Sequence, residues 1–128
     1  MKMHLPYPVS ANRYWRHFRG MTVRSAEATK YISQVKALAL VMRAKPFESS
    51  VKVELLITFH PKRTKKGEPS QIRQDLSNTI KVAEDALQGV LYVNDRQVSR
   101  IVADVGQAIE EGGLTVEVKE IEKSEVKK

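Results

Sequence analysis

The chain has 128 residues, 41% of them hydrophobic, and these values predict one folded domain with a substantial apolar core. It contains no cysteine, which excludes disulfides, thiol catalysis and zinc sites built on cysteine. No apolar run reaches the about 18 residues that a transmembrane helix needs. The first ten residues, MKMHLPYPVS, lack the apolar region of a signal peptide, so we expect a cytoplasmic protein with no membrane partner.

The net charge of +7 is concentrated in two segments. Residues 12–24 hold four arginines and no acid, and residues 61–74 hold five basic residues and one acid. These segments carry +4 each, so the rest of the chain sums to −1. Such asymmetry is typical of a surface that binds nucleic acid. The alternative is that both segments are solvated basic loops.

The N-terminal half predicts a strand, an irregular segment and a helix. Alternation over residues 1–5 indicates a short strand that stops at Pro6, and residues 6–20 read as irregular. Ser25 is a favourable N-cap for a helix that runs to about Arg43. The apolar stripe expected on that helix consists of Ala28, Tyr31, Ile32, Val35, Leu38, Ala39 and Met42. In the irregular segment we expect Trp15 or Phe18 to pack on the core.

The C-terminal half predicts a strand over residues 51–59, a helix from Leu76 to about Leu87, and strands over residues 98–105 and 114–121. Gly89 is the expected C-cap of the helix, and the sequence VND at residues 93–95 indicates a turn. The order is β-α-β-α-β-β. It predicts an α+β fold, with two main helices covering a small mixed or antiparallel sheet. Residues 1–121 form the expected domain, and residues 122–128 a charged tail.

Asp75 is the first candidate for chemistry. An aspartate directly before a helix is a common N-cap, and this structural role needs no active site. On the helix that follows, Asn78, Lys81 and Asp85 fall within roughly 60° of one another. This polar face would adjoin Asp75, although a solvent-facing stripe would look the same.

Asp95 is the second candidate. An Asn-Asp pair in a turn needs no function either. The turn after Gly89 could return the chain along the helix, however, and bring Asp95 towards its N-terminal end, near Asp75.

Together with Lys81, the two aspartates form a minimal set for phosphodiester cleavage. Mg²⁺ takes one or two carboxylates, keeps several waters and bridges to phosphate. A nearby lysine adds positive charge at that phosphate. His4, His17 and His60 show no spacing typical of a zinc site, and we expect them to be structural or exposed.

Three blocks of the sequence, PYPVSANRYWRHFRG, RQDLSNTIKVAEDAL and LYVNDRQV, resemble the RusA family of Holliday-junction resolvases. These are endodeoxyribonucleases of bacteria and prophages. The family pattern has Pro-Pro-Ser-x-Asn-Arg-Tyr, then Asp-x-Asp-Asn followed by a lysine, then Asp-Ala-Leu, then an aspartate just before Gln-Val or Gln-Ile. The resemblance runs from about Leu5 to Ile121.

The resemblance implies a homodimer that nicks opposing strands of four-way DNA junctions in recombination and repair, using Mg²⁺ or in its place Mn²⁺. Asp75, Lys81 and Asp95 are then catalytic, and Asp75 and Asp95 hold the metal, with Ser77 and Asp85 as further candidates. The motif and the basic segments nominate these residues for DNA binding: Asn12, Arg13, Tyr14, Arg16, Arg19, Lys62, Arg63, Lys65, Lys66, Arg73 and Asn78.

Ser77 departs from the family pattern, which has its second aspartate there. A serine hydroxyl can contact a metal or its water but brings no charge. Three explanations are open: Asp85 or another acid substitutes, the site works with fewer ligands, or the chain is a weak or inactive resolvase.

Three functions therefore compete. The first is a Mg²⁺-dependent, junction-selective endonuclease. The second is a junction-binding protein with little nuclease activity because of Ser77. The third is a basic RNA- or ribosome-binding module, whose arginines and aromatic residues in 12–24 would stack on unpaired bases.

Overall fold

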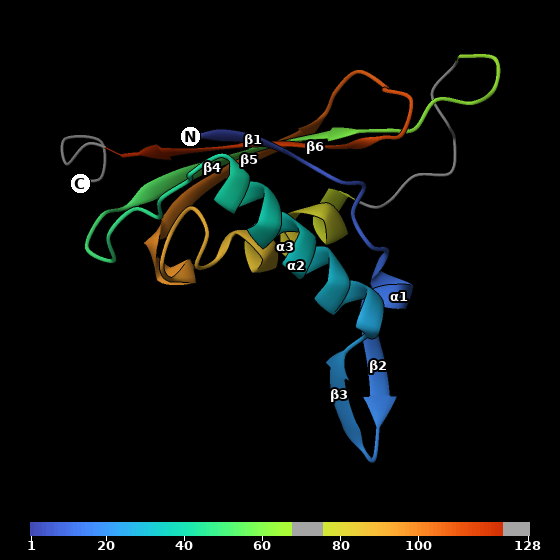
Figure 1. The fold of residues 1–128 in the computed structure, drawn as a ribbon, viewed down its shortest axis with the longest axis horizontal. Coiled ribbons are helices and arrows are strands. Elements are labelled where there is room, and N and C mark those ends of the chain that lie inside the picture. Colours follow the sequence, from blue (N-terminus) through green and yellow to red (C-terminus); the bar gives the residue numbers. More distant parts are fainter. Residues whose placement is uncertain (68–75, 122–128) are drawn as a thin grey trace.

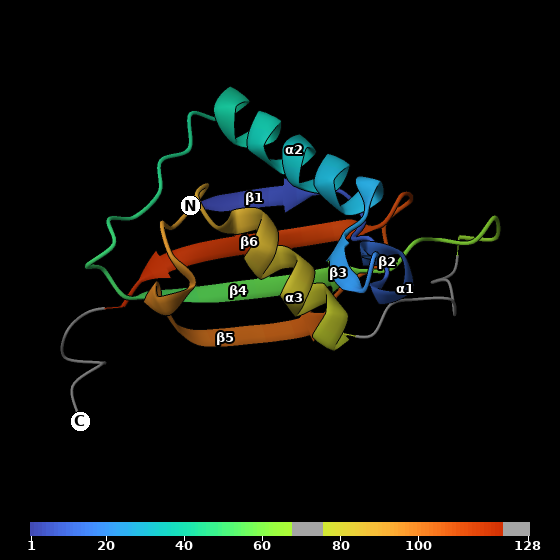
Figure 2. The ribbon, with the colours of Figure 1, turned by 90° about the horizontal axis from the view of Figure 1, so that it is seen from below.

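The structure, a computed structural model, describes residues 1–67 and 76–121, without the side chains of residues 11 and 12. Four strands form the main sheet in the order β1-β6-β4-β5. β4 pairs in parallel with β5 and antiparallel with β6, and β1 pairs antiparallel with β6 (Figure 2). The mixed sheet expected from the sequence is confirmed. Its strands are β1 (Lys2–Leu5), β4 (Val53–His60), β5 (Val98–Val105) and β6 (Gly113–Glu120).

Two helices, α2 (Ala26–Val41) and α3 (Leu76–Leu87), lie side by side over one face of this sheet (Figures 1 and 2). The central strand β4 shows why the core forms there. Its residues alternate between buried and half-buried, so that every second side chain points into the helix layer. The fully covered residues of β4 are Val53, Leu55, Ile57 and Phe59.

The caps expected for α2 are present. The backbone N–H of Ala28 donates to Ser25 Oγ at 3.1 Å, and Arg43 after the helix has a positive φ of 56°. The apolar stripe is shorter than expected, because Leu38 and Met42 are 37% and 43% exposed. Near its C-terminal end α2 lies away from the sheet, and in its last turn only Ala39 is buried (Figure 2).

A two-stranded hairpin projects from the helix side of the molecule, away from the sheet (Figure 1). It follows a short helix α1 (Ala11–Tyr14) and consists of β2 (Trp15–Phe18) and β3 (Met21–Arg24). We call residues 15–24 the arm. The prediction that residues 6–20 are irregular is therefore confirmed for residues 6–10 and wrong for the helix and strand that follow. Arg19 and Gly20 both have positive φ, 50° and 76°, which is the backbone of the two-residue turns that match strand twist.

The aromatic residues of the arm are exposed. Trp15 is 41% exposed and Phe18 is 46% exposed, so the prediction that one of them packs on the core is wrong. Their neighbour Tyr14 takes that place with only 1% exposure, and the Trp15 ring meets the Tyr14 ring edge-on at 5.0 Å.

The expected second helix, turn and final strands are close to those observed. α3 buries Thr79, Val82, Ala83, Ala86 and Leu87. Gly89 has a φ of 82° in the turn that follows, and a short 3₁₀ helix (Asp95–Gln97) leads into β5. None of the helices in residues 1–67 and 76–121 is long and apolar enough to cross a membrane.

The packing of α3 on the sheet can be tested with Leu87→Ala, which removes a side chain with 0% exposure. We expect the free energy of unfolding to fall by about 2–5 kcal/mol, because the truncation leaves a cavity. Urea denaturation measures this. Met21→Ala, at a site that is 58% exposed, is the control and should change stability by less than about 0.5 kcal/mol. Equal effects would contradict the described packing.

Candidate active site

One stripe of α3 faces away from the core and carries polar side chains. Ser77, Lys81, Glu84 and Gln88 follow one another at spacings of four, three and four residues, which places them along one helix face. Ser77, Lys81 and Gln88 are exposed, and Glu84 is half-buried. We call these four residues the outer stripe. It lies on the side of α3 opposite the buried residues Val82, Ala83 and Ala86.

The turn that carries Asp95 is fixed by a buried amide. Gln97 is 1% exposed, and its Oε1 accepts the backbone N–H groups of Val93 and Asn94 at 2.7 and 2.8 Å. Its Nε2 donates to three backbone carbonyls of the segment before β4, those of Phe47, Glu48 and Val51, at 3.3, 2.6 and 3.0 Å. One side chain thus satisfies five backbone groups and joins two loops.

Asp95 itself is exposed and lies beside the end of α3. With the Gln88 amide oriented so that its nitrogen faces the carboxylate, Gln88 donates to both oxygens of Asp95 at 2.8 and 3.1 Å. The expectation that Asp95 returns towards the N-terminal end of the helix is therefore wrong. The 12 residues of α3 span about 18 Å, and Asp95 lies at the C-terminal end of that span, away from Leu76.

Glu84 is an acid of α3 whose pKa is affected by the negative charge of Asp95. Burial, and next the negative charge of Asp95, raise the pKa of the Glu84 carboxyl above its usual range. Lys81 opposes this shift and Asp85 adds to it. Burial, and next the negative charges of Asp95, Glu84 and Asp85, raise the pKa of the Tyr92 hydroxyl. This hydroxyl donates to the Glu84 backbone carbonyl at 2.9 Å. Lys81, Glu84 and Asp95 therefore form one electrostatic group.

Asn78 and Asp85 lie on a different side of α3, against the N-terminal segment. The Asn78 amide donates to the Val9 carbonyl at 3.1 Å. The Tyr14 hydroxyl donates to Asp85 Oδ2 at 2.7 Å. Burial, and then this hydrogen bond, raise the pKa of Tyr14 above its usual range. The burial of Tyr14 argues against direct contact between its ring and DNA, so we reassign it as a positioning residue that joins the arm to α3.

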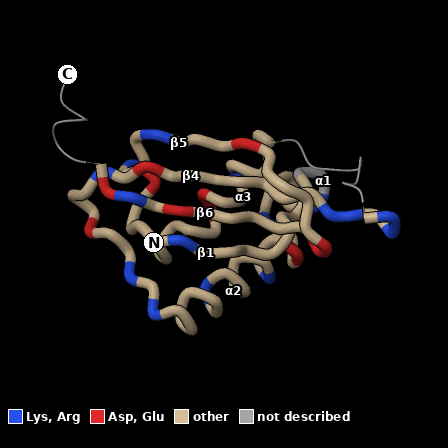
Figure 3. Tube along the Cα trace, turned by 90° about the horizontal axis from the view of Figure 1, so that it is seen from above, with Lys and Arg blue, Asp and Glu red and all other residues tan. Residues whose placement is uncertain are grey.

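The remaining sequence candidates are basic. Arg13 pairs with Glu27 at 3.2 Å but stays 69% exposed, and the guanidinium groups of Arg16 and Arg19 lie 5.3 and 5.2 Å from the Phe18 ring centre. Beyond β4, Lys and Arg residues extend past the sheet (Figure 3). The exposed bases there are Lys62, Arg63, Lys65 and Lys66. The Lys62 ammonium group lies 4.5 Å from the centre of the Tyr7 ring, and Arg63 Nε donates to the Ala108 carbonyl at 3.2 Å. Asp75, Arg73 and the Asn12 side chain lie outside the described residues.

The donor set around Asp95 fits a hard divalent cation. Asp95 and Glu84 offer only oxygen donors, and their mutual repulsion is what a bound cation relieves. Within residues 1–67 and 76–121 no three His, Asp or Glu side chains converge as metal ligands. Two carboxylates remain compatible with Mg²⁺, which keeps several waters and needs few protein ligands.

The comparison with known proteins decides the family. The family model described as Endodeoxyribonuclease RusA matches residues 6–119, which is nearly the whole described domain. The chain belongs to the RusA family. Its helix and sheet arrangement is an α+β fold consistent with that membership.

Individual relatives are identical to this RusA family chain at about a third of the aligned positions. The crossover junction endodeoxyribonuclease RusA of Escherichia coli (strain K12) is 36% identical over 95 residues, covering 73% of this chain and 72% of that protein. The protein of the same name from Shigella sonnei (strain Ss046) is 35% identical over 95 residues, with the same coverage. The one from Enterobacteria phage 82 is 34% identical over 97 residues, again covering 73% and 72%.

Two residues of the site were missed from the sequence. Gln97 is the glutamine that follows the late aspartate in the RusA pattern, and a polar residue between a turn and an apolar strand was the available signal. Glu84 follows Ser77 by seven residues, so the two side chains share one helix face. This spacing could have been recognised from the sequence.

Gln97→Leu tests the claim that the buried amide positions Asp95. The change leaves two N–H groups and three carbonyls without their partner, so we expect the free energy of unfolding to fall by about 2–4 kcal/mol. Thermal or urea denaturation measures it. Gln107→Leu, at an exposed position, is the matched control. A Gln97 variant as stable as this control would show that the turn does not depend on the amide.

Proposed function

We propose that this chain is a crossover junction endonuclease that resolves four-way DNA junctions by paired nicks, in the cytoplasm, during recombination and repair. The observation that carries the proposal is the match of the RusA family model to residues 6–119, and the contact of Gln88, on the outer stripe, with the Asp95 carboxylate supports the place of the site. Family membership also favours DNA over the RNA-binding alternative. The relatives named above are crossover junction endodeoxyribonucleases, which supports the same substrate class.

We propose Mg²⁺, with Mn²⁺ as a substitute, as the cofactor. Asp95 would hold it, with Glu84 as the further acid at that end of the helix. The other sequence candidates would not share this ion within one chain, because Ser77 lies in the first turn of α3, Asp75 precedes it in the sequence, and Asp85 accepts the Tyr14 hydroxyl. When bound, the ion supplies an activated water and neutralises charge at the phosphate. Lys81 is exposed on the same stripe, so its ammonium group can reach a phosphate and stabilise the charge that develops there. Gln88 holds the Asp95 carboxylate in one orientation.

Glu84 is the acid that we propose as a substitute for the aspartate missing at Ser77. Asp85 is the less suitable substitute, because its carboxylate accepts the Tyr14 hydroxyl at 2.7 Å on another side of the helix. Glu84 shares the outer stripe with Ser77 and Lys81 and senses the charge of Asp95. It can therefore supply the second carboxylate that the family pattern has seven residues earlier.

A homodimer is part of the proposal. A two-fold protein suits a junction with approximate two-fold symmetry, because one active site can then serve each of the two nicked strands. Exposed apolar side chains at the end of α2 support a partner surface there, with Leu40 80% and Val41 83% exposed.

The second candidate function is junction binding without efficient cleavage. It is favoured by Ser77, which brings no charge to the stripe where the family has a carboxylate. The basic arm and loop are present in either case.

Asp95→Asn tests the assignment of the site. Removing this carboxylate charge should lower cleavage of a synthetic four-way junction by at least about 100-fold while junction binding persists. Cleavage on denaturing gels and gel shifts measure the two quantities. Asp104→Asn, on an exposed position of β5, makes the same chemical change away from the site and should cut like wild type. Full activity of Asp95→Asn would refute the assignment.

Ser77→Asp and Glu84→Gln test how the site compensates for the missing aspartate. Glu84→Gln should weaken Mn²⁺ binding by about 10-fold, because its carboxylate contributes to the same cation as Asp95. Ser77→Asp should not restore binding in that background, because position 77 lies about 10 Å earlier along the helix. Mn²⁺ titration followed by electron paramagnetic resonance measures this without relying on cleavage. Glu120→Gln, an exposed acid of β6, is the control. Unchanged Mn²⁺ affinity in Glu84→Gln would exclude Glu84 as a ligand.

A further inference from the structure

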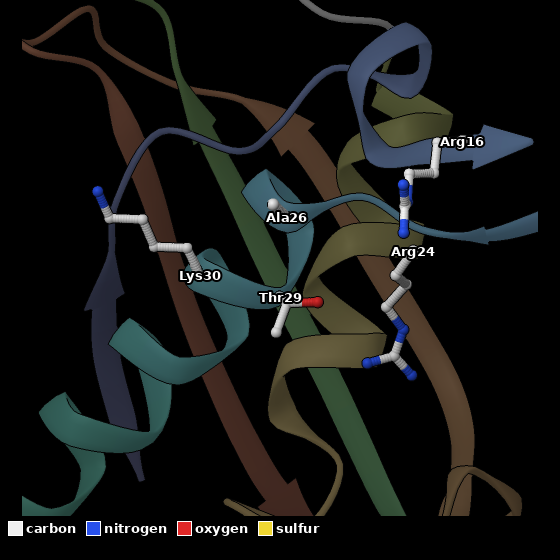
Figure 4. Close-up of a pocket in the computed structure, with 5 residues that line it drawn as sticks. All are labelled: Arg16, Arg24, Ala26, Thr29 and Lys30. Carbon is white, nitrogen blue, oxygen red and sulfur yellow. The ribbon is translucent and has the colours of Figure 1, made fainter. Parts of the chain in front are cut away.

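A cleft of ≈ 550 Å³ opens between the arm and the first turns of α2. Arg16 of β2 and Arg24 of β3 reach it from the arm, and α2 contributes the rest of the lining (Figure 4). The lining residues are Arg16, Arg24, Ala26, Thr29 and Lys30. Three of the five are basic and none is acidic, and only Arg16 was among the DNA contacts predicted from the sequence.

The acid closest to this cleft along the chain is already paired. Glu27 lies in the first turn of α2 but is not among the lining residues, and its carboxylate meets Arg13 Nε at 3.2 Å. The positive charges of Arg16, Arg24 and Lys30 are therefore uncompensated by any acid in the cleft lining. Small side chains, Ala26 and Thr29, leave the middle of the cleft open between the arginines and Lys30 (Figure 4).

The two walls of the cleft are joined by Ser25. Its backbone N–H donates to the Tyr14 carbonyl at 2.8 Å, and its hydroxyl donates to the Arg13 carbonyl at 2.5 Å, which closes the base of the arm. The same hydroxyl oxygen accepts the Ala28 N–H as the N-cap of α2. Because one residue anchors both elements, the basic groups are held in a fixed relation, which lowers the ordering cost of binding an anion.

The cleft also adjoins the candidate active site. Arg24 extends towards α3 (Figure 4), and its charge acts on the Tyr14 hydroxyl, partly offsetting the rise in the pKa of that group. Tyr14 in turn donates to Asp85 of α3. The Tyr14–Asp85 hydrogen bond thus joins the base of the arm to the helix that carries Lys81 and Glu84.

We infer that this cleft binds the phosphate backbone of one arm of the DNA junction, an inference that rests on the proposed function. Arginine and lysine are the side chains that neutralise backbone phosphates, and a threonine hydroxyl is a common further donor. A strand whose phosphates pass Arg24 would continue towards α3, so the cleft orients the junction relative to the outer stripe. Arg24, Thr29 and Lys30 are the residues that this inference adds to the DNA surface.

The experiment removes two charges from the cleft and compares the result with two charges removed elsewhere. Arg24→Gln/Lys30→Gln is the test variant, and Lys2→Gln/Lys119→Gln is the control, on exposed positions of the sheet strands β1 and β6. Gel shifts in EDTA with a four-way DNA junction, at several salt concentrations, measure affinity without cleavage. Circular dichroism confirms that each variant is folded, and Arg24→Lys, which keeps the charge, gives a second variant.

We expect Arg24→Gln/Lys30→Gln to bind the junction about 10-fold more weakly and to reduce the slope of log affinity against log salt by about 1–2, because fewer counterions are released. The control should lose less than about 2-fold, and Arg24→Lys should stay close to wild type. Equal losses in the test and control variants would overturn the inference, as would no loss in either.

Two further outcomes separate this inference from the proposed function. If the wild-type protein cuts junctions and the cleft variant binds them normally, the inference about the cleft is overturned and the proposed function stands. Wild-type protein that does not bind four-way DNA overturns the proposed function and the cleft together. A cleft variant that loses only affinity for a matched RNA duplex would assign the cleft to RNA and overturn the inference.

Discussion

The buried amide of Gln97 is the constraint on which the candidate site depends. Five backbone groups from two loops converge on one side chain with 1% exposure, so neither loop can move without leaving polar groups unsatisfied. The loop on one side carries Asp95, and the segment on the other leads into the central strand β4. Gln97 therefore fixes the position of Asp95 relative to the core, while the Asp95 carboxylate stays exposed and accessible to a phosphate or cation.

The helix α3 divides its surface among three tasks. Its inner side, with Val82, Ala83 and Ala86, packs on the sheet and fixes its position. A second side binds the N-terminal segment through Asn78 and Asp85, and the Tyr14–Asp85 hydrogen bond joins the arm to the helix. The outer stripe is left for chemistry. The same short helix contacts the core and the arm and carries the candidate site. A displacement of the arm would therefore shift the positions of Lys81 and Glu84.

The parts of this fold that follow from local rules were predictable. The alternation of Val53, Leu55, Ile57 and Phe59 identified the central strand, and Ser25 identified the start of α2. The arm was not predicted, because β2 is exposed throughout and shows no alternation of apolar and polar residues, and the alternation in β3 covers only four residues. Gly20, the best signal of the turn, follows an arginine rather than the usual asparagine or aspartate.

The sequence nominated candidate residues for the site but not the geometry that relates them. Sequence spacing selected Lys81 and Asp95, and the RusA resemblance was confirmed by the family match. The position of Asp95 was wrong, because the direction of the chain after Gly89 is set by tertiary contacts of Gln88 and Gln97 that no local pattern encodes. For the same reason Glu84 went unnoticed: its relation to Asp95 exists only once the turn has folded beside the helix.

The most direct test of the account is a cleavage assay of the wild-type chain on a synthetic four-way junction, in Mg²⁺, in Mn²⁺ and in EDTA, run beside a gel shift on the same junction. The account predicts paired nicks on opposing strands in either metal and none in EDTA, which would mean that the site tolerates Ser77. Tight binding without nicks in either metal would contradict it and leave a junction-binding protein built on a resolvase fold.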